Sequence, residues 1–193
     1  KAALSEYATL CQNIDCDYEV KDNYVYSLND PYVLEEEMNA LRKIGYDAAF
    51  CERPFLPIET VGAVQFPAQA QFHPLKFIKG ICADLNLFEN TFVRGIKGNT
   101  AVTDRGTVKA EKIIIATHFP FLNFHGSYPL KLYQDRSYVV ALDNAESVGG
   151  MYVDESGSGL SFRDYNGTLL LGGGGHRTGQ GGNCQSIDAY AEK

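Results

Sequence analysis

The sequence predicts an α+β protein with a mixed, largely antiparallel sheet and flanking helices. Three segments repeat apolar residues at spacings of three and four, which is the pattern of helices with one buried face. A series of shorter segments alternates apolar and polar residues between Gly, Asn and Asp turns, which is typical of antiparallel strands. One run, Ile113–Ala116, is apolar throughout and indicates a single strand buried on both faces.

Composition and charge exclude several classes of protein. The 193 residues, 45% of them hydrophobic and 21% charged, can bury the core of one domain or of one and a half. The net charge is −7 and the basic residues are scattered, which excludes nucleic-acid binding. No apolar run approaches the roughly 18 residues that cross a bilayer, and no signal peptide opens the chain. We therefore expect a cytoplasmic protein without a membrane span. Its five irregularly spaced cysteines are expected to be free, mostly buried thiols rather than zinc ligands.

The first third predicts two helices around a hairpin. Leu4, Tyr7, Ala8, Cys11 and Ile14 form one helical stripe. Alternation over Asp17–Leu28, interrupted at Asp22-Asn23, indicates a hairpin. Asp30-Pro31 then offers a cap and a first-turn proline for a helix that runs to Ile44 and stops at Gly45.

The middle third predicts strands on both sides of another helix. We expect a short strand at Ala48–Phe50, then strands Val61–Phe66 and Ala68–Phe72 separated by Pro67. Pro74 opens a helix whose apolar stripe reaches Leu85. After it come a strand at Leu87–Val93, a hairpin at Ala101–Lys109 that turns at Asp104-Arg105-Gly106, and the buried strand Ile113–Ala116.

The last third predicts four strands and the start of a helix. The strands are expected at Ser137–Leu142, Gly150–Val153, Leu160–Arg163 and Thr168–Leu171. Asn166-Gly167 is a strong signal for a two-residue hairpin turn. Ser186 is a suitable cap for a final helix. Since the chain opens and closes within helical patterns, we expect it to be a piece of a longer protein.

The glycine run Gly172–Gly175 is the first candidate for a ligand site. No Gly-Lys-Ser/Thr follows it, so it does not match a phosphate-binding loop. Four glycines that follow a strand allow close approach of the backbone to a flat group, and a simple mobile turn is the alternative. The adjacent His176-Arg177 favours the first interpretation, in which the glycine run lines a ligand site.

Other candidate residues each have a structural alternative. Thr117 and His118 follow the buried strand, where ligands sit in open α/β sheets, or they simply mark its exit. Arg163 lies in a strand and could bind a carboxylate through its guanidinium, or it could be an ordinary surface arginine. The Tyr138 hydroxyl could orient a polar substrate, although most of the 12 tyrosines must be structural. No catalytic triad signal is present.

The order of these pieces resembles the D-amino-acid oxidase-like family of FAD-dependent oxidoreductases, which includes glycine oxidase and sarcosine oxidase. The resemblance runs over roughly residues 60–180. It rests on the proline-led helix after Phe72-His73, the hairpin Thr103–Ala110, the strand that ends in Ala116-Thr117, and the late strands with Asn166-Gly167 and Leu170–Gly173. It implies substrate-domain parts at 1–86 and 126–193, and a remnant of the FAD-binding domain at 87–125.

The resemblance also implies roles for individual residues. Cofactor contacts would come from Val93, Ala116, Thr117, His118, Gly173 and Gly174, and substrate contacts from Arg163, Tyr138 and His176. The implied reaction is oxidation of an amine or amino acid by hydride transfer to flavin. Without a G-x-G-x-x-G fingerprint in the required setting, this stretch is expected to hold FAD poorly by itself and to be inactive alone. The alternative function is a non-catalytic module that binds a ligand or partner.

Overall fold

The computed structural model describes residues 2–119, 121–122, 126–156, 159–181 and 185–192. These residues form two compact units. The first contains Lys1–Ile81 and Asp135–Lys193, and the second contains Cys82–Gln134. The sequence analysis predicted residues 87–125 for the segment that corresponds to the second unit. The assignment of the two units as substrate and cofactor domains stays a prediction. Each unit is described below by itself.

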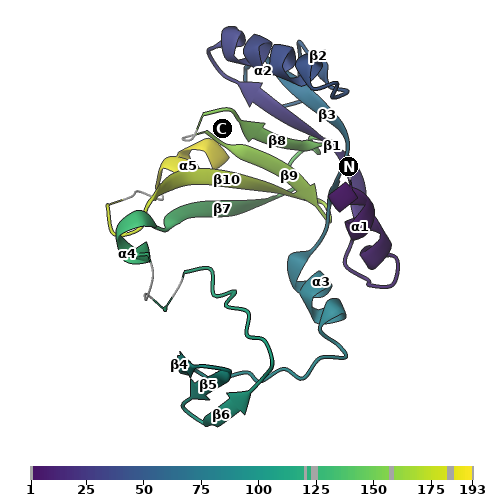
Figure 1. The fold of residues 1–193 in the computed structure, drawn as a ribbon. Coiled ribbons are helices and arrows are strands. Elements are labelled where there is room, and N and C mark those ends of the chain that lie inside the picture. Colours follow the sequence, from purple (N-terminus) through teal and green to yellow (C-terminus); the bar gives the residue numbers. More distant parts are fainter. Residues whose placement is uncertain (1, 120, 123–125, 157–158, 182–184, 193) are drawn as a thin grey trace. The chain divides into compact units, whose positions relative to one another are not determined.

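The first unit is built on a 7-stranded sheet in the order β2-β3-β1-β8-β9-β10-β7 (Figure 1). Neighbouring strands are antiparallel except β1 and β8, which run parallel. This confirms the expected mixed, largely antiparallel sheet. The strands are β1 (Glu19–Ser27), β2 (Ala49–Cys51), β3 (Gly62–Gln71), β7 (Asp135–Asp143), β8 (Met151–Asp154), β9 (Ser161–Tyr165) and β10 (Thr168–Arg177). The helices of this unit are α1 (Ala2–Cys11), α2 (Pro31–Lys43), α3 (Pro74–Ile81) and α5 (Gln185–Ala191).

The main core lies on one side of this sheet, which we call the Leu171 face. Side chains from five strands meet there, and α5 packs on β7 and β10. The buried members are Tyr26, Ala63, Val148, Tyr152, Leu160, Phe162, Leu169, Leu171 and Ile187. Alternate residues such as Arg163 and Leu170 point to the opposite side, the Arg163 face, because side chains alternate along a strand.

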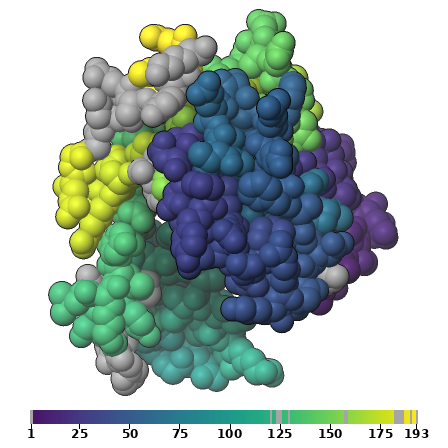
Figure 2. Space-filling view, turned by 90° about the horizontal axis from the view of Figure 1, so that it is seen from above, coloured from purple at the N-terminus to yellow at the C-terminus, as the bar shows by residue number. Residues whose placement is uncertain are grey.

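The helix α2 covers the β3 end of the Arg163 face. Its stripe of Leu34, Met38 and Leu41 packs on Val64 of β3. The Asp30 carboxylate accepts a hydrogen bond from the Tyr32 N–H, and the helix ends before Gly45, whose φ is +66°. Both helix ends were predicted from the sequence. The view from above places the dark blue segment that contains α2 in front (Figure 2).

Two predicted strand breaks were wrong. The expected hairpin at Asp22-Asn23 is a single strand, β1, and the two strands expected around Pro67 are one strand, β3. The two interrupted positions lie opposite each other in the sheet. Lys21 pairs with Gln69 and Asn23 pairs with Phe66, so β3 has one residue more than β1 between these pairs. Ala68, in this part of β3, has a φ of +52°. The Asp22 carboxylate accepts the Ala68 N–H at 2.9 Å. These residues therefore form a β-bulge, not two turns.

The glycine run also differs from its prediction. The strand β10 does not end at Leu171 but continues through the four glycines to Arg177. It pairs with β7 along the run, with an irregularity between Gly173 and His176, where Gly174 has a φ of +65°. Glycine is needed at this point because few other residues adopt a positive φ inside a strand. The expected α5 is present, while the side chain of Ser186 and all of Cys184 lie outside the described residues.

The second unit contains a 3-stranded sheet, β4 (Val93–Lys97), β5 (Thr100–Thr103) and β6 (Gly106–Lys109), and the short helix α4 (Tyr128–Lys131). The predicted hairpin between β5 and β6 is confirmed. The strand expected at Leu87–Val93 was wrong, because β4 starts only at Val93. The helix expected to reach Leu85 ends at Ile81 in the first unit, and Leu75 and Ile78 of its stripe are exposed.

The buried strand expected at Ile113–Ala116 was also wrong. The segment has no assigned secondary structure, and Ile114 is 89% exposed. In the described part of the chain no strand pairs with this segment, so it does not form part of a sheet. Helices long and apolar enough to cross a membrane are also absent from the described residues.

Candidate functional site

A stacked pair of rings, Tyr138 and His176, lies at the β7 end of the sheet. Register places Tyr138 opposite Gly173 and His176 opposite Arg136, so all these residues point to the Leu171 face. The ring centroids of Tyr138 and His176 are 5.7 Å apart with an interplanar angle of 23°. His176 Nδ1 lies 3.3 Å from the carbonyl oxygen of Gly174, at the irregular point of β10. The structure thus brings Tyr138, His176, Gly173 and Gly174 together, while the roles proposed for them stay predictions.

The glycines of β10 approach other parts of this chain closely. A Cβ on Gly173 would lie 2.7 Å from Cδ2 of Leu160, and one on Gly172 would meet the Ser161 hydroxyl. Close packing between β10 and the segment at β9 therefore explains these two glycines without a ligand. Gly174 is different, because its positive φ bends the strand beside the two rings.

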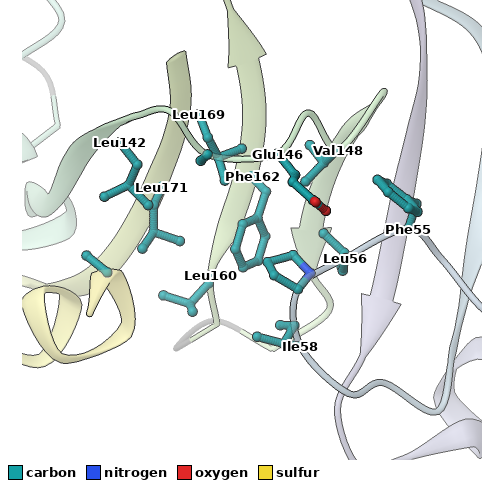
Figure 3. A pocket seen from close by; sticks show the side chains of 13 residues that line it. Phe55, Leu56, Ile58, Leu142, Glu146, Val148, Leu160, Phe162, Leu169 and Leu171 are labelled. Atoms are coloured by element: carbon teal, nitrogen blue, oxygen red, sulfur yellow. The ribbon is translucent and has the colours of Figure 1, made fainter. Parts of the chain in front are cut away.

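A cavity of about 460 Å³ lies on the Leu171 face, and the sequence analysis did not foresee it. The side chains in Figure 3 converge on it from β7, β9 and β10, from the loops next to these strands, and from the segment with Leu56 and Ile58. Leu160 lines the cavity and also lies close to Gly173, which is paired with Tyr138. The lining is apolar except for Glu146: Phe55, Leu56, Pro57, Ile58, Leu142, Ala145, Val148, Leu160, Phe162, Leu169, Leu171 and Ala191. The proline-rich bend at Pro54 and Pro57 was the available sequence signal.

Arg163 lies on the other side of the sheet. It pairs with Leu170 of β10 and Met151 of β8, whereas its neighbour Phe162 is in the main core. Because side chains alternate between faces, Arg163 and the Tyr138–His176 pair are separated by the sheet itself. The three residues proposed to bind one substrate are therefore not brought together. Arg163 instead lines a second, smaller cavity with Gln71, His73 and Tyr165.

An ion pair with a tyrosine borders this smaller cavity. The Asp17 carboxylate accepts hydrogen bonds from Lys76 Nζ at 2.8 Å and from the Tyr165 hydroxyl at 2.7 Å. These two hydrogen bonds, the one from Lys76 first, hold the pKa of Asp17 below its usual range. The same pair raises the pKa of Lys76. Asp17 has a φ of +54°, so the network fixes a backbone shape that few residues adopt.

This network predicts a pH-dependent contribution to stability. Since the folded-state pKa of Asp17 is lowered, the contribution is present above the unfolded value of about 3.9 and is lost as pH falls through the folded pKa. Asp17→Asn, which tolerates the positive φ, should lower the free energy of unfolding at neutral pH, and the deficit should shrink in acid. Chemical denaturation at a series of pH values measures it, with Asp47→Asn at an exposed position as the control. A deficit that does not change with pH would contradict the ion pair.

The cofactor residues proposed in the second unit come from two separate segments. Val93 begins β4 and is half-buried, whereas Ala116 and Thr117 lie in the exposed segment without secondary structure. The Thr117 hydroxyl donates to the Phe119 carbonyl at 2.9 Å, and His118 has a φ of +61°. In the described residues, no group of three or more His, Cys, Asp or Glu side chains could hold a metal ion.

Two of the thiols pack together and are poorly suited to catalysis. Cys11 and Cys16 are buried in one cluster with Phe77. Burial, with a contribution from Cys16, raises the pKa of Cys11 to about 11, so its thiol stays protonated and unreactive at neutral pH. The four cysteines in the described part of the chain are free, as expected, although Cys51 and Cys82 are only partly buried.

Comparison with known proteins gives matches along nearly the whole chain. The model of a family described as FAD dependent oxidoreductase matches residues 1–191. A curated protein of Bacillus subtilis strain 168, named "Putative Rieske 2Fe-2S iron-sulfur protein YhfW", is 31% identical over an alignment of 184 residues that covers 87% of this chain and 36% of that protein. The chain therefore spans little more than a third of this relative.

Solved structures share the fold. Glycine oxidase from Bacillus cereus is 20% identical with a TM-score of 0.70, and the match covers 97% of this chain and 59% of that one. L-proline dehydrogenase from P. horikoshii is 14% identical with a TM-score of 0.71, and the match covers 99% and 60%. At these identities the likeness concerns the fold alone, and it confirms the expected fold class.

Proposed function

The chain belongs to the family of FAD-dependent oxidoreductases, and on this premise we propose that the natural protein oxidises an amine or amino acid. The supporting observation in the structure is the Tyr138–His176 stack beside the bend at Gly174. This arrangement offers a flat aromatic surface and polar ring atoms next to an irregular glycine backbone. Such a surface suits a planar cofactor ring on one side and a small polar substrate on the other.

The residues present fit the flavin ring but not the rest of FAD. A planar ring could approach the strand at Gly174, where the positive φ bends the backbone and no Cβ projects. Gly173 offers less room, because Leu160 already occupies the space beside it. The residues that the sequence proposed for the dinucleotide, Val93, Ala116, Thr117 and His118, lie in the second unit, and Ala116 and Thr117 are exposed there. None of the described strand–helix connections carries the G-x-G-x-x-G spacing that binds a pyrophosphate. We therefore propose that tight FAD binding needs further parts of the protein.

In this proposal Tyr138 and His176 orient the substrate. In the tautomer with its proton on Nδ1, His176 donates to the Gly174 carbonyl, which fixes the ring and leaves Nε2 as an acceptor. That nitrogen can accept a hydrogen bond from the substrate amine, while the Tyr138 hydroxyl can donate to a substrate carboxylate. FAD, when bound, supplies the acceptor for the hydride. Because Arg163 lies on the opposite face of the sheet, we assign it no part in this contact.

Flavin absorbance and its loss test the proposal. The full natural protein, reconstituted with FAD, should be yellow, and small amines or amino acids should bleach the flavin under anaerobic conditions. Tyr138→Phe should raise KM about tenfold through the loss of one hydrogen bond to a charged group. Tyr32→Phe removes the same hydroxyl at a site that is 63% exposed in α2 and should change nothing. Protein that takes up no flavin would support the alternative, a non-catalytic module that binds a ligand or partner.

The route of the electrons has two candidates. Oxygen is one acceptor, and the relative whose name describes an iron–sulfur protein favours the other, an iron–sulfur cluster. The bleached protein tests oxygen: rapid recovery of the yellow colour on admission of air indicates oxygen as the acceptor. Slow recovery together with fast reduction of an added one-electron acceptor excludes oxygen and is the behaviour that a cluster requires. The cytoplasmic location stays a prediction.

A further inference from the structure

The cavity of about 460 Å³ on the Leu171 face has the features of a binding site that is separate from the ring pair. It lies within the first unit, and every residue that lines it is among those that the structure describes. Its lining contains neither Tyr138 nor His176, and none of the glycines of β10. The function proposed for the ring pair therefore does not account for this cavity.

The first feature is a concave shape inside the core. Phe162, Leu169 and Leu171 form the floor of the cavity on β9 and β10, and these three side chains are buried members of the main core. Figure 3 shows the helix α5 on one side of this floor and the segment with Leu56 and Ile58 on the other. Protein cores contain few voids larger than a water molecule, so a space of this size between core side chains is an exception.

The second feature is the apolar character of the lining. Of the 13 residues that line the cavity, Glu146 alone is polar. An engineered apolar cavity of about 150 Å³ stays dry and binds benzene, and pockets for small molecules have volumes of about 300–1,000 Å³. A cavity of about 460 Å³ therefore has room for an alkyl chain or an aromatic ring of several carbons.

The third feature is a negative charge at the open side of the cavity. Glu146 and Phe55 both line the cavity and are exposed, so a ligand can enter from solvent on this side. Figure 3 shows the oxygen atoms of Glu146 on the side of Phe55 and Leu56. Within the described residues no cation pairs with this carboxylate. Its charge therefore favours a ligand with a positive group over one with a negative group.

We propose that this cavity binds a small amphiphilic cation. An alkyl chain or aromatic ring of several carbons fills the apolar space, and an ammonium group lies beside Glu146. The chain supplies the affinity through the apolar surface that it removes from water. The carboxylate supplies the preference for a cation over an anion with the same chain, which is a modest effect because Glu146 is exposed. Since the ring pair takes no part, binding does not require flavin.

Equilibrium dialysis of the full natural protein against alkyltrimethylammonium ions tests the site, because a quaternary nitrogen cannot be oxidised as an amine. The affinity should rise about fourfold with each methylene from butyl to hexyl, which is the usual gain for a methylene removed from water. Hexanoate, with a chain of the same length and the opposite charge, should bind at least about threefold more weakly than hexyltrimethylammonium. An affinity that does not depend on chain length, or no binding of the hexyl compound, would overturn the proposal.

Two variants assign the binding to this cavity. Ala145→Leu enlarges a side chain of the lining and should weaken binding of hexyltrimethylammonium at least about tenfold, because the added carbons occupy space that the ligand needs. Glu146→Gln should remove the preference over hexanoate and keep the dependence on chain length.

Each variant has a matched control. Ala141→Leu makes the same enlargement on β7 at an exposed position opposite Leu170, on the Arg163 face, and Glu35→Gln removes the same charge from an exposed position in α2. Both controls should leave binding unchanged. The thermal transition of each variant shows whether it is folded. Because Glu146 is exposed, an undiminished preference for the cation in Glu146→Gln rejects the site even if Ala145→Leu does not fold.

Discussion

Replacing Leu171 by alanine is expected to lower the free energy of unfolding by about 2–5 kcal/mol, which is the usual cost of a leucine truncated in a core. Leu171 is 1% exposed and lies on β10, where it is paired with Phe162 on β9 and Val140 on β7. The loss combines the removed apolar contacts with an enlarged void, because Leu171 already lines the 460 Å³ cavity. Urea denaturation of the natural protein measures the change through the shift in midpoint at constant slope.

The same substitution at Leu75 is the control. Leu75 lies in α3 of the same unit and is 71% exposed, so Leu75→Ala should change the free energy of unfolding by no more than about 0.5 kcal/mol. If both variants lose the same amount, the Leu171 face is not the core of the unit. In that case the placement of Tyr138 and His176 on this face would also have to be revised.

Local signals in the sequence predicted local structure correctly. Asn166-Gly167 is the clearest example, since both residues have positive φ, at +50° and +81°, as a two-residue hairpin turn requires. The turn pairs Tyr165 with Thr168, and this pairing in turn sets Arg163 and Leu171 on opposite faces. The turn thus predicts that Arg163 and Leu171 lie on different faces, whereas burial shows which of the two faces carries the core.

Features that depend on distant partners could not be predicted. Asp22 and Pro67 each looked like the end of a strand, and only the pairing of β1 with β3 shows that they form one bulge. The stack of Tyr138 on His176 depends on the register of β7, which no turn signal specifies. Likewise, Gln71 is an unremarkable residue in the sequence. Its unsatisfied oxygen follows from two hydrogen bonds to Glu19 and Asp164, which belong to other strands.

The segment Ile113–Ala116 shows the limit of composition as a guide. Its four apolar residues have the composition of a strand buried on both faces. A strand, however, exists only if neighbours satisfy its backbone N–H and C=O groups. In the described residues β4, β5 and β6 pair with one another and not with this segment. The composition of this segment favours a strand, but no strand forms because no neighbouring strand pairs with it in the described residues.

Replacing Gly62 by alanine is expected to destabilise the protein by about 2–4 kcal/mol, through backbone strain and crowding together. Gly62 begins β3 at a φ of +134°, a conformation that side chains rarely allow. A Cβ there would lie 2.7 Å from Cζ of Phe50 and 3.2 Å from the carbonyl oxygen of Cys51. Because that oxygen belongs to the paired strand β2, it cannot move without disturbing the edge of the sheet.

A comparison with Gly45 separates the two causes. Gly45 also has a positive φ, at +66°, but nothing lies within 4 Å of its would-be Cβ, so Gly45→Ala should cost only about 1–2 kcal/mol. In a background with Phe50→Ala, the cost of Gly62→Ala should fall by about 1 kcal/mol, because the nearest crowding atom has been removed. If Gly62→Ala costs no more than Gly45→Ala and shows no coupling to Phe50, the close approach of β2 and β3 at this point is contradicted. The coupling between Gly62→Ala and Phe50→Ala is the more specific test of crowding, because backbone strain at Gly62 does not depend on the Phe50 ring.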